Sequence, residues 1–478
     1  MPTAVPTVAG ARTVGVGAGR VLVRAGAVAG LAAALGACLW MVAAAAERPS
    51  VLSPPSLRSP QSWLLGPLHG ALPHLTTAVP TLRADLDIAL VVLFAAWLVA
   101  WACAPALPVR AVAAAVGAAQ VLFVLGPPQP VTDVFNYLVY GRMAARGLNP
   151  YAHPPVAGSH DVAYALSNWH HLPSPYGPLF TLLSEPLALL PLPAAFWAWK
   201  VVVGACAIAM LGLVWWLARR LGRSPQRAIV FAGLCPVTLA VGVGGFHNDL
   251  PAVLCVLAAG ACLLRAAEAT EPGMRWDAAA GALVVLASGL KPPFAIVVPL
   301  VLLGAHRRLP AAAGAVVATA IVGAVTLVAF DGVWPSLGAQ GALVTPLSVP
   351  NLLGLAAGHQ GADPAVRAAG RDALVVIVVA ATAAVAWRRR WALPAIGAVL
   401  LASVLTLSWT MPWYLAWALP FAAIGRPRML APFAVATCVW LGVGASPVMP
   451  KLIHALGYFP TRTTTGLANH RYEQRLVR

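Results

Sequence analysis

The sequence predicts an all-α protein that crosses a lipid bilayer many times. Hydrophobic residues make up 60% of the 478 positions, and charged residues make up only 9%. Apolar runs recur from one end to the other, many with the roughly 20 residues that a membrane helix needs. They are continuous and rich in Ala, Leu and Val, without the two-residue alternation of a membrane β-barrel, so helices are expected.

Thirteen apolar segments are predicted to be membrane helices, although several are short for a hydrocarbon core about 30 Å thick. They lie at 21–46, 86–103, 109–125, 195–217, 228–244, 250–264, 278–290, 294–303, 311–330, 373–387, 391–407, 413–424 and 430–445. The helices are expected to share one core, which gives a single polytopic domain at 1–447 and a basic polar tail at 448–478. The first run ends in four alanines that could mimic a signal-peptide cleavage site. At about 22 apolar residues it exceeds the usual apolar region of a signal peptide, so a retained first span is expected.

Arginine predicts the orientation of these helices. The formal net charge is +17. In a membrane protein, basic residues of this kind are expected in cytoplasmic loops and beside anionic lipid headgroups rather than bound to nucleic acid. Five short loops carry arginine clusters: Arg219, Arg220, Arg223 and Arg227; Arg265 and Arg275; Arg307 and Arg308; Arg388, Arg389 and Arg390; Arg426 and Arg428. Thirteen spans with a cytoplasmic N-terminus put all five clusters in the cytoplasm. Arg48, Arg58 and Arg83, in the first outer loop, break the rule.

One further apolar stretch, at 178–192, would invert the later topology if it crossed the membrane. It has about 15 residues and contains Glu185, Pro186, Pro191 and Pro193. A re-entrant or interfacial segment is therefore expected.

In this topology, polar segments that carry more than arginine gather on the outer face. They are the loop at about 127–194, the turn 245–249, residues 289–293, the loop 331–371 and residues 408–414. The inner turns carry little besides arginine. Any chemistry is therefore expected to face outward, unless the loop around 131–178 is only a solvated connection, since exposed loops are polar by default.

Two acids in these outer segments stand out because acids are scarce in this chain. Asp133 and Asp249 are each predicted to lie at a membrane boundary beside aromatic or imidazole side chains. Partial burial raises the pKa of a carboxyl group, which suits a general base. The alternative for each is a helix N-cap, where Asp is favoured. Asp161 is a more remote rival, in a Gly/Pro/His-rich loop.

Cationic and aromatic residues in the same segments suggest a ligand. Lys291 is one of only three lysines, and either its side chain snorkels to the interface or its charge holds a phosphate oxygen. Arg142 runs against the positive-inside bias, so an anionic ligand is the simplest explanation, with His247 assisting. The aromatic residues Trp409, Trp413, Tyr414 and Trp417 fit an interfacial belt, or they stack on sugar faces.

Metal and nucleotide motifs are not evident. The seven cysteines fall within apolar runs without metal-ligand spacing, so neither disulfides nor a metal site is predicted. No Gly-rich phosphate loop follows a strand pattern. No cofactor is expected.

Ordered motifs across about 109–424 resemble a known enzyme family. They are Asp133-Val134-Phe135-Asn136-Tyr137, Gly141-Arg142, Gly147-Leu148-Asn149-Pro150-Tyr151, Ser174 to Leu179, Gly245 to Asp249, Leu290-Lys291-Pro292-Pro293 and Trp413-Tyr414-Leu415. In this order and spacing they resemble the GT-C fold, polyprenol-phosphate-mannose-dependent α-(1→6)-mannosyltransferases of actinobacterial lipomannan assembly.

The resemblance implies an inverting transfer at the extracytoplasmic face of the plasma membrane. The donor would be a sugar, with mannose expected, on a polyprenyl phosphate, and the acceptor a lipid-linked glycan. Asp133 matches the catalytic Asp of the family. Lys291, Arg142 and His247 are predicted to hold the donor phosphate. The predicted substrate-binding residues are Asn136, Tyr137, Tyr176, Asn248, Asp249, Trp413 and Tyr414.

Two other functions stay open at this point. A transporter or flippase of a lipid-linked sugar would place ionisable residues near the bilayer midplane, often on broken helices. In this sequence the predicted midplanes carry almost no charge, which favours chemistry at the surface. A structural scaffold would not need the polar stretch around Asp133.

Overall fold

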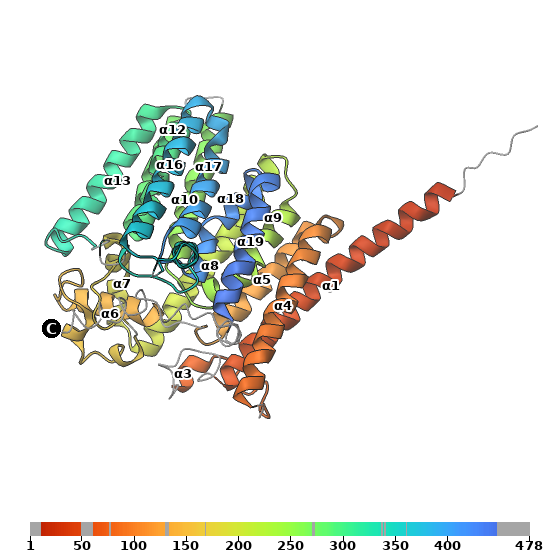
Figure 1. Cartoon of the computed structure of the whole chain (residues 1–478), viewed down its shortest axis with the longest axis horizontal. Helices are drawn as coiled ribbons and strands as arrows, with labels where there is room; N and C mark the ends of the chain where they lie inside the picture. Colours follow the sequence, from red (N-terminus) through yellow and green to blue (C-terminus); the bar gives the residue numbers. More distant parts are fainter. Residues whose placement is uncertain are drawn as a thin grey trace, which may run out of the picture.

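The computed structural model describes residues 11–48, 61–75, 78–129, 133–167, 169–269, 273–335, 338, 341–359 and 361–446. All regular elements in these ranges are helices, packed as a bundle with α1 projecting from one side (Figure 1). The all-α membrane fold that the sequence predicts is confirmed, with eight helices long and apolar enough to cross a bilayer. The predicted tail at 448–478 lies outside the described residues.

The eight long helices coincide with eight of the thirteen predicted spans. They are α1 (Ala11–Glu47), α4 (Val79–Cys103), α8 (Leu192–Arg220), α10 (Asp249–Glu268), α13 (Arg308–Ala329), α16 (Pro364–Trp387), α17 (Ala392–Thr406) with the short turn before it, and α19 (Pro427–Ala445). The first predicted span belongs to α1, which packs along α4 and α5 (Val109–Leu125).

The other five predicted spans are shorter or interrupted helices. Two are α5 and α11 (Met274–Leu290). The remaining three break: α9 (Pro225–Gly233) gives way to the π-type turn η6 (Thr238–Val243), while η7 (Pro292–Val297) precedes α12 (Val298–Gly304) and η9 (Pro412–Trp417) precedes α18 (Leu419–Ile424). Proline lies at or near each break, and it lacks the N–H that a continuous helix needs. The count of thirteen crossings stays a prediction.

The stretch at 178–192 forms no long helix. It folds as α7 (Pro178–Ser184) and the 3-10 turn η5 (Glu185–Leu189). Both pack against α6 (Asp133–Ala145), and α7 also packs against α11 and α13. These short elements fit a segment that does not cross the membrane by itself.

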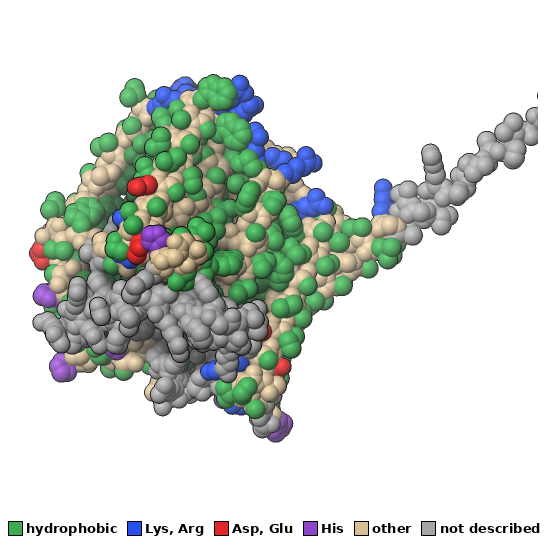
Figure 2. Space-filling model, in the orientation of Figure 1, with side chains coloured by type: hydrophobic (Ala, Val, Ile, Leu, Met, Phe, Trp, Pro, Cys, Tyr) green, Lys and Arg blue, Asp and Glu red, His purple; other side chains and the backbone are tan. Residues whose placement is uncertain are grey.

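The five arginine clusters lie at one end of the bundle, which Figure 2 shows as a concentration of basic side chains at the top. Contacts join the loops that carry them. Arg220 pairs with Glu268 at 3.3 Å, and Arg223 donates to the carbonyl of Gly425 at 3.5 Å. Arg426 lies 3.8 Å over the Trp391 ring.

The predicted outer segments meet at the other end of the same helices. Asn149 donates to the carbonyl of Phe330 at 2.7 Å, which joins the loop at about 127–194 to the loop after α13. The Thr345 amide donates to the carbonyl of Ser408 at 2.9 Å. The bundle therefore has a basic end and an end where the polar segments converge.

Candidate active site

Asp133 is the first residue of α6 and is nearly buried, with 9% of its surface exposed. Its Oδ1 accepts a hydrogen bond from Nδ2 of Asn136 at 3.4 Å, and the Trp169 amide donates to Oδ1 of Asn136 at 3.2 Å. Burial raises the pKa of Asp133 to about 6, against an opposing effect of the Lys291 charge. The side chain is therefore poised to exchange a proton near neutral pH.

The turn before α10 faces Asp133. Phe246 has a positive φ of 55°, a conformation that costs a bulky residue energy and needs support from its surroundings. Its carbonyl accepts a hydrogen bond from Nε1 of Trp199 at 2.8 Å. A Cβ at Gly245 would lie 2.3 Å from the carbonyl oxygen of Val241, so only glycine fits there. This strained turn aims the next three side chains into the site.

His247 is the first of these three and is fully buried. Its ring stacks on Trp413 with a centroid separation of 3.7 Å and an interplanar angle of 10°. Nδ1 lies 3.3 Å from the Tyr137 hydroxyl and 3.6 Å from Oδ2 of Asp133, which is too far for a hydrogen bond to Asp133. Burial, together with the Lys291 charge, lowers the pKa of His247, so the imidazole is neutral at pH 7.

Asp249 and Lys291 form a buried ion pair on the other side of the site. Lys291 Nζ lies 2.6 Å from Oδ1 of Asp249, and the same oxygen accepts a hydrogen bond from Nε1 of Trp417 at 2.5 Å. Nζ also donates to Oδ1 of Asn248 at 3.3 Å and lies 4.9 Å over the Tyr414 ring. These contacts hold the Lys291 ammonium in place at the end of α11.

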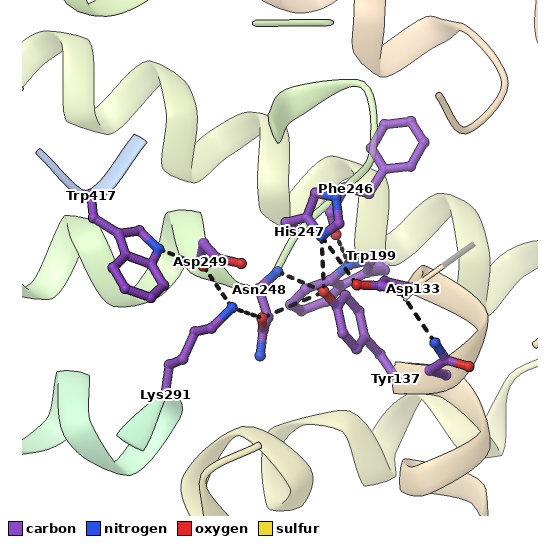
Figure 3. Close-up of polar contacts among 10 residues, drawn as sticks. Asp133, Tyr137, Trp199, Phe246, His247, Asn248, Asp249, Lys291 and Trp417 are labelled. Carbon is purple, nitrogen blue, oxygen red and sulfur yellow. Dashed lines mark hydrogen bonds and ion pairs between the residues drawn. The ribbon is translucent and has the colours of Figure 1, made fainter. Parts of the chain in front are cut away.

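Figure 3 shows the two halves joined through Asn248 and Tyr137. The Tyr137 hydroxyl donates to Oδ1 of Asn248 at 3.4 Å and accepts from the Asn248 amide at 3.3 Å. Three buried polar atoms of the turn have no hydrogen-bond partner among the described residues: His247 Nε2, Asn248 Nδ2 and Asp249 Oδ2. Orphaned buried polar atoms are costly and invite a ligand that satisfies them.

The structure brings together all but one of the residues that the sequence predicts for the site. The cluster contains Asp133, Asn136, Tyr137, His247, Asn248, Asp249, Lys291, Trp413 and Tyr414. Tyr176 packs edge-on against Tyr137 with a centroid separation of 4.9 Å.

Three of the alternative roles do not fit these positions. The N-cap of α10 is Asn248 rather than Asp249, whose carboxylate binds Lys291 and Trp417. Lys291 does not snorkel, because its side chain is only 9% exposed. Trp413 and Trp417 are 5% and 1% exposed, so they are not a lipid-facing belt.

Arg142 is the one predicted site residue whose contacts lie outside this cluster. Its Nε lies 2.8 Å from Oδ2 of Asp161, and Arg146 NH1 reaches the same oxygen at 2.8 Å. Arg142 NH1 also donates to the carbonyls of Ala188 and Leu190, both at 3.4 Å. These contacts tie α6 to its own loop and to η5, and a role of Arg142 at the donor phosphate stays a prediction.

Several contributors were not predicted for the site from sequence. Trp199 holds the strained turn, Trp417 binds Asp249, and the Trp169 amide holds Asn136. Trp199 lies within an apolar run, so no local pattern marks it, whereas Trp417 belongs to the aromatic set expected to form a belt or to stack on sugar faces. No group of three or more His, Cys, Asp or Glu side chains placed to bind a metal occurs within the described ranges.

Comparison with known proteins identifies the family. Residues 23–307 match a family model described as alpha-(1->6)-mannopyranosyltransferase, N-terminal domain. The chain belongs to this family. The matched region is more than half of the chain and includes Asp133, the turn with His247, and Lys291. The aromatic residues of η9, which contact His247 and Lys291, lie outside the matched region.

The curated relatives are actinobacterial. A probable alpha-(1->6)-mannopyranosyltransferase of Mycolicibacterium smegmatis is 26% identical, over 63% of this chain and 62% of the relative. Two alpha-(1->6)-mannopyranosyltransferases of Mycobacterium tuberculosis are each 26% identical, over 66% and 60% of their own lengths. The chain thus matches less than two thirds of each of these relatives. No solved structure matches.

Proposed function

We propose that this chain is a membrane mannosyltransferase, with residues 1–447 as one catalytic domain. It transfers mannose from a polyprenyl phosphate to a lipid-linked glycan, with inversion at the anomeric carbon and Asp133 as the base. Family membership and the names of the relatives support the sugar and the reaction class. The site chemistry supports the roles of the residues.

The observation that carries this proposal is the difference between two neighbouring buried carboxylates. Asp249 is neutralised by Lys291 and hydrogen-bonded by Trp417. Asp133 has neither contact, and burial raises its pKa to about 6. A carboxylate bound by a cation and an indole acts as a fixed charge, whereas the one with the raised pKa suits a proton acceptor.

Lys291 is placed to hold the donor phosphate. An ammonium has three N–H donors, and Asp249 and Asn248 accept two of them. The third is available for a phosphate oxygen. Asp249 thus fixes the Lys291 cation, while the orphaned Asn248 Nδ2 and Asp249 Oδ2 offer a donor and an acceptor to the hydroxyls of the sugar.

The proposed step balances without a cofactor. The acceptor hydroxyl oxygen bonds to the anomeric carbon as its proton passes to Asp133. The bond from that carbon to the phosphate oxygen breaks, and the polyprenyl phosphate leaves with the electron pair, its charge stabilised by Lys291. One carboxylate suffices because the phosphate needs no general acid, unlike the leaving group in most glycosidases. Inversion produces an α linkage from a β-linked donor.

The arrangement of charge in the bundle supports an extracytoplasmic site. The arginine clusters lie at the end of the bundle opposite the site, and basic loops favour the cytoplasm. Asp133, Asp249 and Lys291 all stand at helix ends rather than in mid-helix, as surface chemistry requires. A transporter or flippase would need such groups along a path between both faces.

Purified protein with polyprenyl-phosphate mannose and a short mannoside acceptor tests the proposal, by detection of an acceptor extended by one mannose. Asp133→Asn keeps the shape but cannot accept the proton. It should lower product formation by about 10²–10⁴-fold while donor binding persists. Asp133→Asn turnover near the wild-type rate would exclude Asp133 as the base, and Asp249 would be tested next. Absence of an extended product with the wild-type protein would refute the proposed function.

A further inference from the structure

Lys200 is a buried lysine that the proposed reaction does not use. It lies near the start of α8, and none of its surface is exposed. Its Nζ donates to the carbonyl of Gly126 at 2.7 Å and lies 3.4 Å over the Trp197 ring. None of the ion pairs among the described residues includes Lys200. The side chain therefore does not snorkel to water and has no acidic partner.

A lysine in this position is costly. Transferring an ammonium into an apolar span is unfavourable, and a hydrophobic side chain of similar volume often packs there at least as stably. Stability of the bundle alone is thus a weak reason for Lys200. A buried ionisable residue in a membrane helix points to a function.

The contacts of Lys200 lead to two backbone segments, of which the turn 245–249 carries site residues. One is the segment from Gly126 to Gln129, which precedes α6. The other is the strained turn, because Nζ lies 4.9 Å from the Phe246 ring centroid. The two segments also touch each other, since the Gln129 amide donates to the carbonyl of Gly244 at 2.9 Å. Lys200 thus contacts both segments close to where they pair.

The strained turn has a second support on the same helix. Trp199 donates to the Phe246 carbonyl, while Lys200 Nζ faces the Phe246 ring. Two consecutive residues of α8 therefore contact the backbone and the side chain of Phe246. Phe246 keeps a φ of 55° in this clamp. His247 follows directly, and its ring position depends on the backbone that Phe246 sets.

From these contacts we infer that Lys200 is a positioning residue: it binds the Gly126 carbonyl and the Phe246 ring, and so fixes His247 relative to Asp133. This inference rests on the proposed function for its effect on turnover. Its other part, that Lys200 fixes the position of His247 in the turn, does not depend on catalysis. The two claims need separate measurements.

Turnover is measured in Lys200→Met, which removes the amino group but keeps the length. It should lower kcat by about 10- to 100-fold, since small misplacements of catalytic groups cost this much. KM for donor and acceptor should change by less than about twofold, because Lys200 is fully buried and is proposed to act only through the turn. Lys200→Arg, which restores a cation and donors, should recover part of the rate. The folded fraction at the assay temperature, followed by thermal unfolding, should stay at the wild-type value.

Geometry is measured by modification of histidine with diethyl pyrocarbonate, mapped by mass spectrometry. His247 is fully buried and should be protected in the wild type, but it should react faster in Lys200→Met. The exposed His160 serves as the internal control and should react equally in both proteins. This readout separates the inference from the proposed function, since an inactive wild type would refute the proposed function and leave the histidine result to decide on Lys200.

The coupling is tested by a double-mutant cycle. If Lys200 acts through Phe246, Lys200→Met should cost much less in a Phe246→Ala background than in the wild type. An unchanged kcat with His247 still protected would overturn the inference. So would a loss of kcat in proportion to the folded fraction. If Lys200→Met does not fold, Lys200→Gln, which keeps a donor for Gly126, replaces it, and failure of both to fold would assign Lys200 to bundle stability and overturn the inference.

Discussion

At the scale of single residues, the two buried carboxylates of the site differ in the groups that contact them. Lys291 and Trp417 both contact one oxygen of Asp249, whereas Asp133 is hydrogen-bonded by the Asn136 amide and lies 3.6 Å from His247 Nδ1. Burial without a directly bonded cation favours the protonated form, which is why the Asp133 pKa rises. Sequence context does not reveal this difference, because both acids are predicted to lie at a membrane boundary beside aromatic or imidazole side chains.

The pH dependence of transfer should report on Asp133. A base works only when deprotonated, so activity is lost as pH falls below its pKa of about 6. We expect kcat/KM to fall about tenfold per pH unit below that value and to level off above it. The residual rate of Asp133→Asn should lack this inflection. A wild-type profile that is flat between pH 5 and 7 would contradict the assignment.

Lys291→Ala should weaken use of the donor much more than use of the acceptor. Removing one partner of a buried charged contact costs about 2–5 kcal/mol, partly because Asp249 is left unpaired. The measurement is kcat/KM for each substrate with the other saturating. Arg146→Ala is the matched control, since the Arg146 side chain is 57% exposed and pairs with Asp161 away from the cluster. An unchanged donor dependence in Lys291→Ala would remove this residue from the donor site.

At the scale of elements, close backbone contact joins the outer loop to the membrane helices. The Gly177 amide donates to the carbonyl of Leu290 at 3.1 Å, beside Lys291. A Cβ at Gly177 would lie 2.0 Å from the carbonyl oxygen of Gly289. The start of α7 can therefore approach the end of α11 only because position 177 has no side chain. This contact brings Tyr176 into the same cluster as Lys291.

Gly177→Ala should push these two elements apart. The new methyl group meets backbone, which cannot rotate away, and overpacking of this kind costs about 1–3 kcal/mol. We expect a lower unfolding temperature in detergent and reduced transfer. Gly323→Ala on α13 is the control, because nothing lies within 4 Å of its added Cβ, and it should be neutral or slightly stabilising. Equal behaviour of the two variants would show that the Gly177 contact is not tight.

At the scale of the whole molecule, charge distinguishes the two ends of the bundle. The α10 helix begins at Asp249 in the site and ends beside Arg265, and α11 returns from the arginine end to Lys291. A helix of about 20 residues is about 30 Å long, the thickness of the hydrocarbon core. The length of these two helices therefore sets the distance between the site and the basic loops at about the thickness of the membrane core.

Accessibility labelling tests the orientation of the two ends. In a background with the native cysteines replaced, Ser159→Cys and Arg389→Cys each present one exposed thiol. An impermeant maleimide added to intact cells should label position 159 only. Position 389 should react after the membrane is opened, because basic loops remain in the cytoplasm. Labelling of both positions from the same side would refute the topology, starting with the interpretation of 178–192 as a segment that does not cross.

Sequence by itself determined the membrane class, the helical segments and the end of the bundle at which the polar segments gather. These features follow from local properties: apolar runs must be helical in lipid, and arginine in short loops marks one side. The eight long helices coincide with predicted spans for this reason. Asp133, the turn with His247, and Lys291 could be named because polar residues are rare in this chain.

Only the tertiary structure decided which polar side chains pair. Arg142 and Lys291 are both cations in predicted outer segments, yet one binds Asp161 and the other Asp249. Sequence does not show that Trp417 binds Asp249 or that Lys200 lies against the Phe246 ring, because only the fold brings these pairs together. The reason is physical: burial and hydrogen bonding depend on segments distant in the chain, whereas helix formation in lipid depends on the segment alone.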